Sequence, residues 1–382
     1  LAIGEGLGPI MNDSSCGQCH STPAIGGGST TFVTRFGKSA QGGMPFDPLA
    51  YLGGSLRQDE SIDPAIFEVV PPEADVTANR LTPISCGAGL LEAIDDNDIV
   101  DNANLVHAFV NGFVRMAAPV EGGPARPGRF GWKGGVSSVL TFSADASVNE
   151  LGLTNRFFGT ESAPNGDLAL LALWDNVADP EDGPDIEGYD RIDRQTDFQR
   201  LLAAPPQTPR SGMAGEAVFD SIGCGACHLT PGYTTGSGAL SILDGQTIKP
   251  YSDFLLHDMG TLGDRIVDGP ATQQIMQSRA LWGLSQRASF LHDGRATGST
   301  FFGNVDLAIM EHDGEAAFSR TNWTNLGATQ QNQLVAFLGS LGRAEFDWDV
   351  NNRVDEFDWF FLEPLMTGPG AAARPNPRSP RR

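Results

Sequence analysis

Apolar residues recur at helical spacing in two stretches of the second half of the chain. Residues 211–223 predict a short amphipathic helix, because four apolar side chains share one helix face. They are Ala217, Val218, Phe219 and Ile222. Residues 329–342 predict a second helix that stops at Gly342. Its apolar positions are Leu334, Val335, Leu338 and Leu341.

Glycine and proline are abundant in the rest of the chain, with 47 and 25 residues respectively. These residues favour turns and irregular segments, so the pattern predicts long loops rather than sheets. We therefore expect a mainly α fold with long Gly/Pro-rich loops.

Two Cys-x-x-Cys-His motifs supply the candidate chemistry. They are Cys16-Gly-Gln-Cys19-His20 and Cys224-Gly-Ala-Cys227-His228. This spacing is typical of c-type haem attachment, in which two thiols bind the vinyl groups and the histidine becomes the proximal iron ligand. Zinc ribbons place two Cys-x-x-Cys pairs much closer together, and a thioredoxin-type motif needs a βαβ context. Cys86, the fifth cysteine, is predicted to be a buried free thiol.

Similar sequence follows each motif, which indicates duplication of one haem-binding unit. Thr-Pro and Gly come soon after both histidines. We expect two cytochrome c-like haem domains, residues 1–205 and 206–345, divided near Pro205 in a Pro-rich stretch. Residues 346–382 would form a C-terminal extension and a surface tail. The two predicted helices resemble the first and last helices of a cytochrome c fold.

The chain is acidic, with 47 Asp and Glu against 25 Lys and Arg and a net charge of −22. This charge argues against binding to nucleic acid or to anionic lipid. It would attract a partner with a basic face, or it serves only solubility. No stretch approaches the ~20 apolar residues of a membrane span.

The chain begins at Leu1 with no leader segment, so we interpret it as a mature form whose export signal has been removed. Because bacteria attach haem to such motifs outside the cytoplasm, we expect a periplasmic or extracellular location. The Asp-rich stretch at 175–197 offers oxygen ligands for calcium, but it lacks the ordered spacing of a calcium loop, and a solvated acidic loop is favoured.

Four histidines lie outside the motifs, and each is either a further iron ligand or a hydrogen-bonded polar residue. They are His107, His257, His292 and His312. A filled sixth position on haem iron favours electron transfer, whereas an open one admits a substrate.

Several segments resemble the di-haem oxidoreductases, relatives of the bacterial di-haem cytochrome c peroxidases. In the second half they are DFLLHDMGTLGD, SRALWGLSQRASFLHDGRA, LAIMEHDGEA and LVAFLGSLG. In the first half they are GLGPIMNDSSCGQCHSTPAIGGG, LLEAI, GRFGWKGG and NELGLT. The resemblance runs from Gly6 to about Gly342.

The resemblance implies that the haem at His228 transfers electrons and has a distal ligand. Aligning AIMEHDG with the ligand segment of the peroxidases places His312 there, with His257 as the alternative. Two imidazole ligands give low-spin iron at a lower potential than a His/Met pair. His292 and His257 would then lie near this haem.

The haem at His20 is the one that meets peroxide in these relatives. The resemblance implies that Glu150 acts there as the acid–base group, although a surface glutamate at a helix end is equally compatible with the sequence. Trp132 would lie between the haems as an electron relay, or only pack in the core. Lys133 is a further candidate for a haem ligand or a propionate partner.

We therefore expect an oxidoreductase with two haem c groups that reduces hydrogen peroxide at haem 1 with electrons delivered through haem 2. A soluble small cytochrome or cupredoxin would be the electron donor. The alternatives are a pure electron-transfer cytochrome and a di-haem oxidase of an organic or protein substrate. A high-spin component in the oxidised spectrum would separate an enzyme from a pure carrier.

Overall fold

A computed structural model describes residues 6–40, 44–105, 107–177, 183–205, 213–236 and 238–342. The predicted extension and tail at 346–382 lie outside these residues, and so do residues 206–212 of the Pro-rich stretch.

The described residues contain ten α-helices. They are α1 (Cys16–Cys19), α2 (Ala88–Glu92), α3 (Asp96–Asn102), α4 (Val139–Leu151), α5 (Leu168–Trp174), α6 (Arg191–Leu201), α7 (Ala214–Ser221), α8 (Phe301–Glu311), α9 (Ala317–Thr324) and α10 (Ala328–Ser340). Among these helices, none is long and apolar enough to cross a membrane.

Eleven short strands lie between the helices. They are β1 (Ile10–Met11), β2 (Phe32–Gly37), β3 (Leu56–Arg57), β4 (Glu60–Ser61), β5 (Val76–Leu81), β6 (Met116–Ala117), β7 (Arg126–Pro127), β8 (Tyr233–Thr234), β9 (Thr247–Ile248), β10 (Leu256–Asp258) and β11 (Ile275–Gln277). They form five small antiparallel sheets, the largest with the order β3-β2-β5.

The expectation of a mainly α fold with loops in place of sheets is therefore wrong. Most of the strands have only two or three residues, which is too short for an alternating pattern to be visible in sequence. Strands β2 and β5 are longer and pair from Phe32 opposite Leu81 to Gly37 opposite Val76. Their polar residues and a glycine concealed both strands among turn-forming segments, and β3 and β4 lie between them in the sequence.

Helices α7 and α10 confirm the two helices predicted from apolar spacing. They pack against each other, with the ring centroids of Phe219 and Phe337 5.5 Å apart. Gly215 lies where α7 meets α10, and a Cβ at this position would be 2.0 Å from the carbonyl oxygen of Gln333. The close contact between these two helices thus requires glycine.

Gly215→Ala is expected to destabilise the fold by about 1–3 kcal/mol, because backbone atoms cannot yield to the added methyl group. The check is the midpoint of thermal unfolding. Gly236→Ala is the matched control, since a Cβ there meets nothing within 4 Å. Equal midpoints for both variants would contradict the close packing of α7 on α10.

The hydrophobic core crosses the predicted domain boundary. One cluster of buried residues combines α2, α3 and Phe130 with Tyr233, Phe254 and Trp282 from the second half. Isolated bridges join Ile94 to Thr235 and Phe113 to Leu256. The division near Pro205 stays a prediction, and residues on both sides of it share a core.

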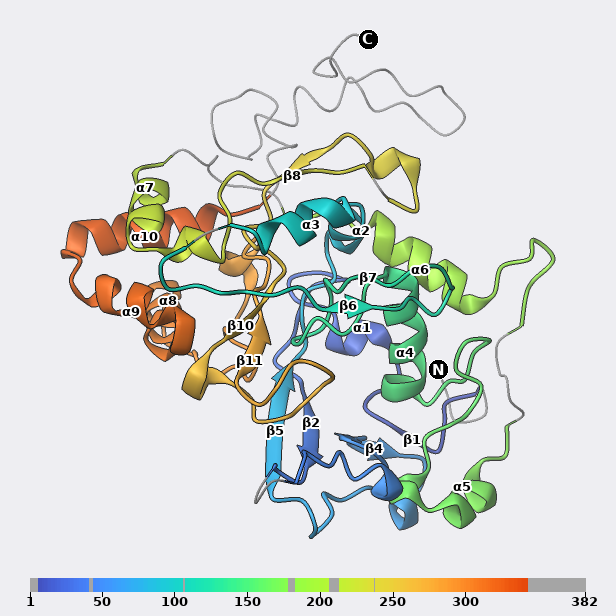
Figure 1. Cartoon of the computed structure of the whole chain (residues 1–382). Coiled ribbons are helices and arrows are strands. Elements are labelled where there is room, and N and C mark those ends of the chain that lie inside the picture. The colour runs from blue at the N-terminus through green and yellow to red at the C-terminus, as the bar shows by residue number, and fades with distance from the viewer. Residues whose placement is uncertain are drawn as a thin grey trace.

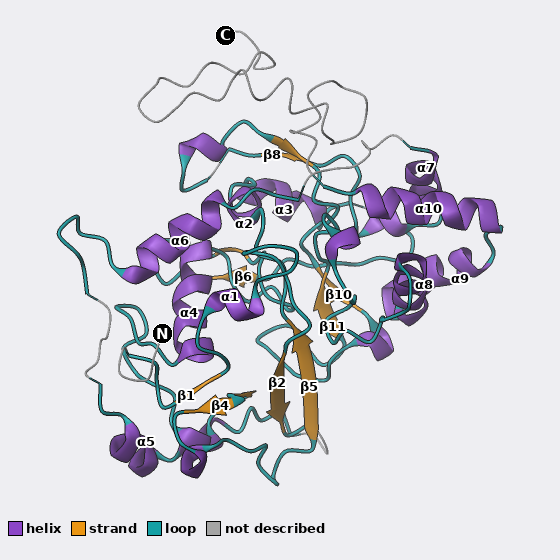
Figure 2. Ribbon diagram, turned by 180° about the vertical axis from the view of Figure 1, so that it is seen from behind, coloured by secondary structure: helices purple, strands orange, loops and turns teal. Residues whose placement is uncertain are grey.

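Figure 1 shows α7, α8, α9 and α10 gathered on one side of the molecule, with α4 and α6 on the other. Strands β10 and β11 lie between these groups, and β2 and β5 extend away from them. The reverse view again places α1, which carries the first motif, beside α4 (Figure 2). The two Cys-x-x-Cys-His motifs are thus built on different sets of helices.

Candidate functional site

The second motif forms a 3-10 turn at Cys224–Ala226, directly after α7. His228 follows this turn, and its Nδ1 lies 2.9 Å from the carbonyl oxygen of Tyr251. When Nδ1 donates its proton to that carbonyl, Nε2 stays free to bind a metal. Burial lowers the pKa of His228 to about 4, which keeps the imidazole neutral, as metal ligation requires.

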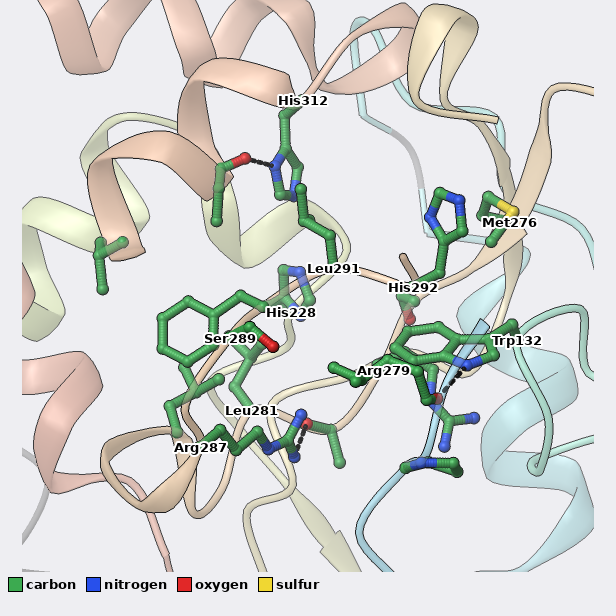
Figure 3. Close-up of a pocket in the computed structure, with 18 of the residues that line it drawn as sticks. Trp132, His228, Met276, Arg279, Leu281, Arg287, Ser289, Leu291, His292 and His312 are labelled. Atoms are coloured by element: carbon green, nitrogen blue, oxygen red, sulfur yellow. Dashed lines mark hydrogen bonds between the residues drawn. The ribbon is translucent and has the colours of Figure 1, made fainter. Parts of the chain in front are cut away.

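A cavity of about 450 Å³ opens over this histidine (Figure 3). Both thiols of the second motif line it. Its apolar walls include Phe219, Leu284, Phe290, Val305, Leu334 and Leu338. A large apolar ring system bound through Cys224 and Cys227 would bury its faces against such walls.

His312 extends into the same cavity from the end of α8, across from His228 (Figure 3). Its Nδ1 lies 2.7 Å from the carbonyl oxygen of Ala308, so its Nε2 is also left for a ligand. Burial lowers the pKa of His312. The two imidazoles are close enough for His312 to contribute to the lowered pKa of His228.

His257 lines the cavity beside Cys227, but both of its ring nitrogens have carboxylate partners. Nε2 lies 3.0 Å from Asp253, and Nδ1 lies 2.9 Å from Glu315. Burial opposes the charged form, yet these hydrogen bonds raise the pKa of His257 to about 12. The cation has no free nitrogen for iron, unlike His312.

Cys227, Asp253 and His257 also place three metal-binding atoms within 4.8 Å of one another. Haem attachment through Cys227 would consume the thiolate of this group. The cluster is therefore better explained as a hydrogen-bonded ion pair beside the attachment site.

Trp132 and His292 lie together at another side of the cavity (Figure 3). Their rings meet edge to face with centroids 6.2 Å apart. The indole Nε1 of Trp132 donates to the carbonyl oxygen of Leu81, 3.0 Å away. The cavity lining also includes Gln18, which is part of the first motif, and Ser21, which follows its histidine.

The first motif repeats the geometry of the second. Helix α1 holds Cys16 and Cys19, and the Nδ1 of His20 lies 3.1 Å from the carbonyl oxygen of Gly27. Burial lowers the pKa of His20. In both motifs the Nδ1 of the histidine thus lies beside a backbone carbonyl, and burial favours the neutral imidazole that a proximal haem ligand requires.

Glu150 lies near the C-terminal end of α4 and close to this first motif. Asn12 donates a hydrogen bond from Nδ2 to Oε2 of Glu150, at 2.6 Å. Burial raises the pKa of Glu150, although this hydrogen bond works against the shift. Glu150 is also one cause, after burial and Asp13, of the raised pKa of Cys19. Glu150 is therefore grouped with haem motif 1, whereas Trp132 lines the cavity of motif 2.

Residues 72–341 match the sequence model of a family described as "Di-haem oxidoreductase, putative peroxidase". The chain belongs to this family. The match contains the second motif and begins after the first one. Searches of curated proteins and of solved structures found no match to this di-haem oxidoreductase.

Arg35 is a residue of this di-haem oxidoreductase that the sequence did not single out. It lies on β2, and its Nε is buried without a hydrogen-bond partner among the described residues. Burial lowers its pKa, while the nearby charges of Glu150 and Asp145 oppose that shift. A cation thus lies beside the candidate acid–base group, and β2 carried no pattern that pointed to it.

Lys133 is held by structural contacts. Its Nζ donates to the carbonyl oxygens of Thr272 at 2.9 Å and Ile275 at 2.7 Å, and it pairs with Asp264 at 3.0 Å. These three partners leave the ammonium group no remaining donor for a haem.

Two other predictions concern single groups. Cys86 has no disulfide partner but is half-buried rather than buried. His107 is exposed and borders a small pocket with His257, away from the first motif.

In the acidic stretch, the described carboxylates Asp185 and Asp193 form ion pairs with arginines, so we do not assign calcium there. Residues 178–182 of that stretch lie outside the described residues.

Proposed function

We propose that this di-haem oxidoreductase attaches two c-type haems covalently and reduces hydrogen peroxide at the haem of the first motif. The haem of the second motif would pass on the electrons. The domains would be residues 1–205 and 206–345, one for each haem. The support for attachment is the repeated geometry of His20 and His228, each with one nitrogen bound to a backbone carbonyl.

The observation that carries the proposal is a structural repeat in which one unit has a glutamate where the other has a histidine. A tight turn closed by a bridge, Phe130 to Val136 in one unit and Phe290 to Ala296 in the other, precedes α4 and α8. Trp132 and His292 are the third residues of these two turns.

Both helices then begin with a hydroxyl cap that accepts from the third residue of the helix, Ser138 from Thr141 and Thr300 from Gly303. Twelve residues after Ser138 is Glu150, and twelve residues after Thr300 is His312. One unit therefore offers a carboxylate where the other offers an imidazole.

This difference supports a different role for each unit. An imidazole at this position can fill the sixth coordination site, which suits electron transfer. A carboxylate whose pKa is raised by burial holds a proton more readily than an ordinary carboxylate, so it can accept a proton and return it. His312 is accordingly the proposed distal ligand of haem 2, and Glu150 is the proposed acid–base group of haem 1.

When bound, the haem of the first motif would supply iron that can accept electrons and bind a peroxide oxygen. Glu150 takes a proton from one peroxide oxygen and delivers it to the other, which leaves as water. Asn12 holds Oε2 of Glu150 in place through its side-chain amide. The overall change consumes two electrons and two solvent protons for each peroxide and yields two molecules of water.

Electrons would pass between the haems by way of Trp132 and His292, whose rings are in contact. The net charge of −22 favours a donor with a basic face, such as a small cytochrome or cupredoxin. Since c-type haem is attached outside the bacterial cytoplasm, the proposed location is the periplasm or the extracellular space.

Two measurements test this proposal. Haem staining after denaturing electrophoresis should reveal covalent haem, and Cys16→Ser and Cys224→Ser should each weaken one attachment. Adding peroxide or cyanide should then shift the optical spectrum of one haem. The protein should also reduce peroxide with electrons from an artificial donor. Covalent haem with no spectral shift and no turnover, even after partial reduction, would leave a pure electron carrier.

A further inference from the structure

Two arginines that line the cavity over His228 lack acidic partners. No carboxylate of the described residues lies within ion-pair distance of Arg279 or Arg287. Arg279 donates to the carbonyl oxygen of Gly131 at 3.0 Å, and Arg287 donates more weakly to Trp282 at 3.3 Å. The Nε of Arg287 is buried and has no hydrogen-bond partner among the described residues.

Such partners are present elsewhere in the chain. Arg80 is buried and pairs with Asp264 at 2.6 Å, and Arg200 pairs with Glu92 at 2.7 Å. Arg320 also lines the cavity, and it pairs with Asp313 at 3.1 Å. Of the three arginines that line the cavity, Arg320 therefore has a carboxylate partner among the described residues, and Arg279 and Arg287 have none.

This arrangement is unfavourable unless an anion enters. Burial lowers the pKa of each guanidinium to about 10, and the charge of Arg287 adds to the shift at Arg279. Two buried cations repel each other, and each also loses the favourable free energy of hydration that it would have in water. Their own backbone contacts neutralise neither charge.

We propose that Arg279 and Arg287 bind the two propionate groups of the haem attached at Cys224 and Cys227. This inference rests on the proposed function, because it requires haem at the second motif. Haem carries two carboxylates on one edge of the ring, and the cavity offers two neighbouring cations. A guanidinium binds a carboxylate with two parallel hydrogen bonds.

Their placement would also set the orientation of a haem bound at this motif. Both arginines lie on the side of the cavity away from His312 (Figure 3). The guanidinium carbon of Arg279 is 5.5 Å from the ring centroid of Trp132. The propionate edge of haem 2 would therefore face Trp132, and Arg279 would contact both the haem and the proposed electron relay.

The test measures the reduction potential of haem 2 in purified holoprotein carrying Arg279→Gln, Arg287→Gln or both. Losing a cation leaves a propionate charge uncompensated, which stabilises oxidised iron, so the midpoint potential should fall in each variant and fall furthest in the double variant. The Arg287→Lys variant keeps the charge and should shift the potential less. Arg194→Gln, an exposed arginine paired with Asp185, should leave it unchanged.

The propionate-bending bands in the resonance Raman spectrum give a second readout, independent of potential and of turnover. These bands should move in the Gln variants. Unchanged potential and unchanged bands, at full haem content, would overturn the inference. If the Gln variants fold poorly, Arg287→Lys still decides it, because replacing a two-bond guanidinium contact by an ammonium should move the bands.

A soluble anion is the competing ligand, and inorganic phosphate distinguishes it. If the two arginines bind the haem propionates, an arrangement we call the propionate clamp, added phosphate should not change the wild-type potential at constant ionic strength. A phosphate-dependent potential in the wild type that disappears in the double variant would overturn the clamp. Haem content is measured first, because absence of covalent haem would defeat the proposed function. If haem is present but the arginine variants leave the potential and the bands unchanged, only this inference is overturned.

Discussion

His312→Ala is expected to convert one of the two haems from low-spin to high-spin and to leave the other unchanged. The reason is that His312 presents a free Nε2 to the cavity over His228, with its Nδ1 held by Ala308. Removing a strong axial imidazole leaves five-coordinate or water-bound iron. Electron paramagnetic resonance of the oxidised protein measures the change, with haem content as the normalisation.

The controls for this prediction are two other histidine variants. His107→Ala removes an exposed imidazole and should leave both spin states unchanged. His257→Ala should also preserve the low-spin haem, because its two nitrogens bind Asp253 and Glu315. A spin change in His257→Ala, with none in His312→Ala, would identify His257 rather than His312 as the distal ligand.

Local sequence was enough to predict those features that depend on nearby residues. The motif spacing identified both pairs of candidate thiols, and the apolar faces identified α7 and α10. The family resemblance was also confirmed over residues 72–341. In the two motifs and the two helices, the informative residues lie within one or two helical turns of one another.

The remaining features depend on contacts between distant segments. Most of the sheets were missed because their strands have only two or three residues. The longer strands β2 and β5 were concealed by their polar residues, and Arg35 on β2 was missed with them. The lack of acidic partners at Arg279 and Arg287 depends on what lies around them in space. Even the correspondence of Glu150 with His312 became clear only once Ser138 and Thr300 were seen to cap their helices.

Glu150→Gln is expected to lower peroxide turnover by about 10²–10⁴-fold, the usual cost of losing one general acid–base group. Glutamine keeps the size of the side chain and can still bond to the amide of Asn12, but it cannot carry the proton between the two peroxide oxygens. Turnover is measured with an artificial electron donor at equal haem content. Glu187→Gln is the matched control, because Glu187 is exposed and pairs only with Arg194 among the described residues.

The pH profile separates this role from a structural one. Burial raises the pKa of Glu150, so the carboxylate form needed to accept the proton is lost on acidification at a higher pH than for an ordinary carboxyl group. Wild-type turnover should therefore fall along an acid limb that lies above the usual carboxyl range, and this limb should be absent from the residual activity of Glu150→Gln. A variant that keeps full turnover, or that loses turnover but retains the same acid limb, would remove Glu150 from the proton-transfer step while leaving both haems in place.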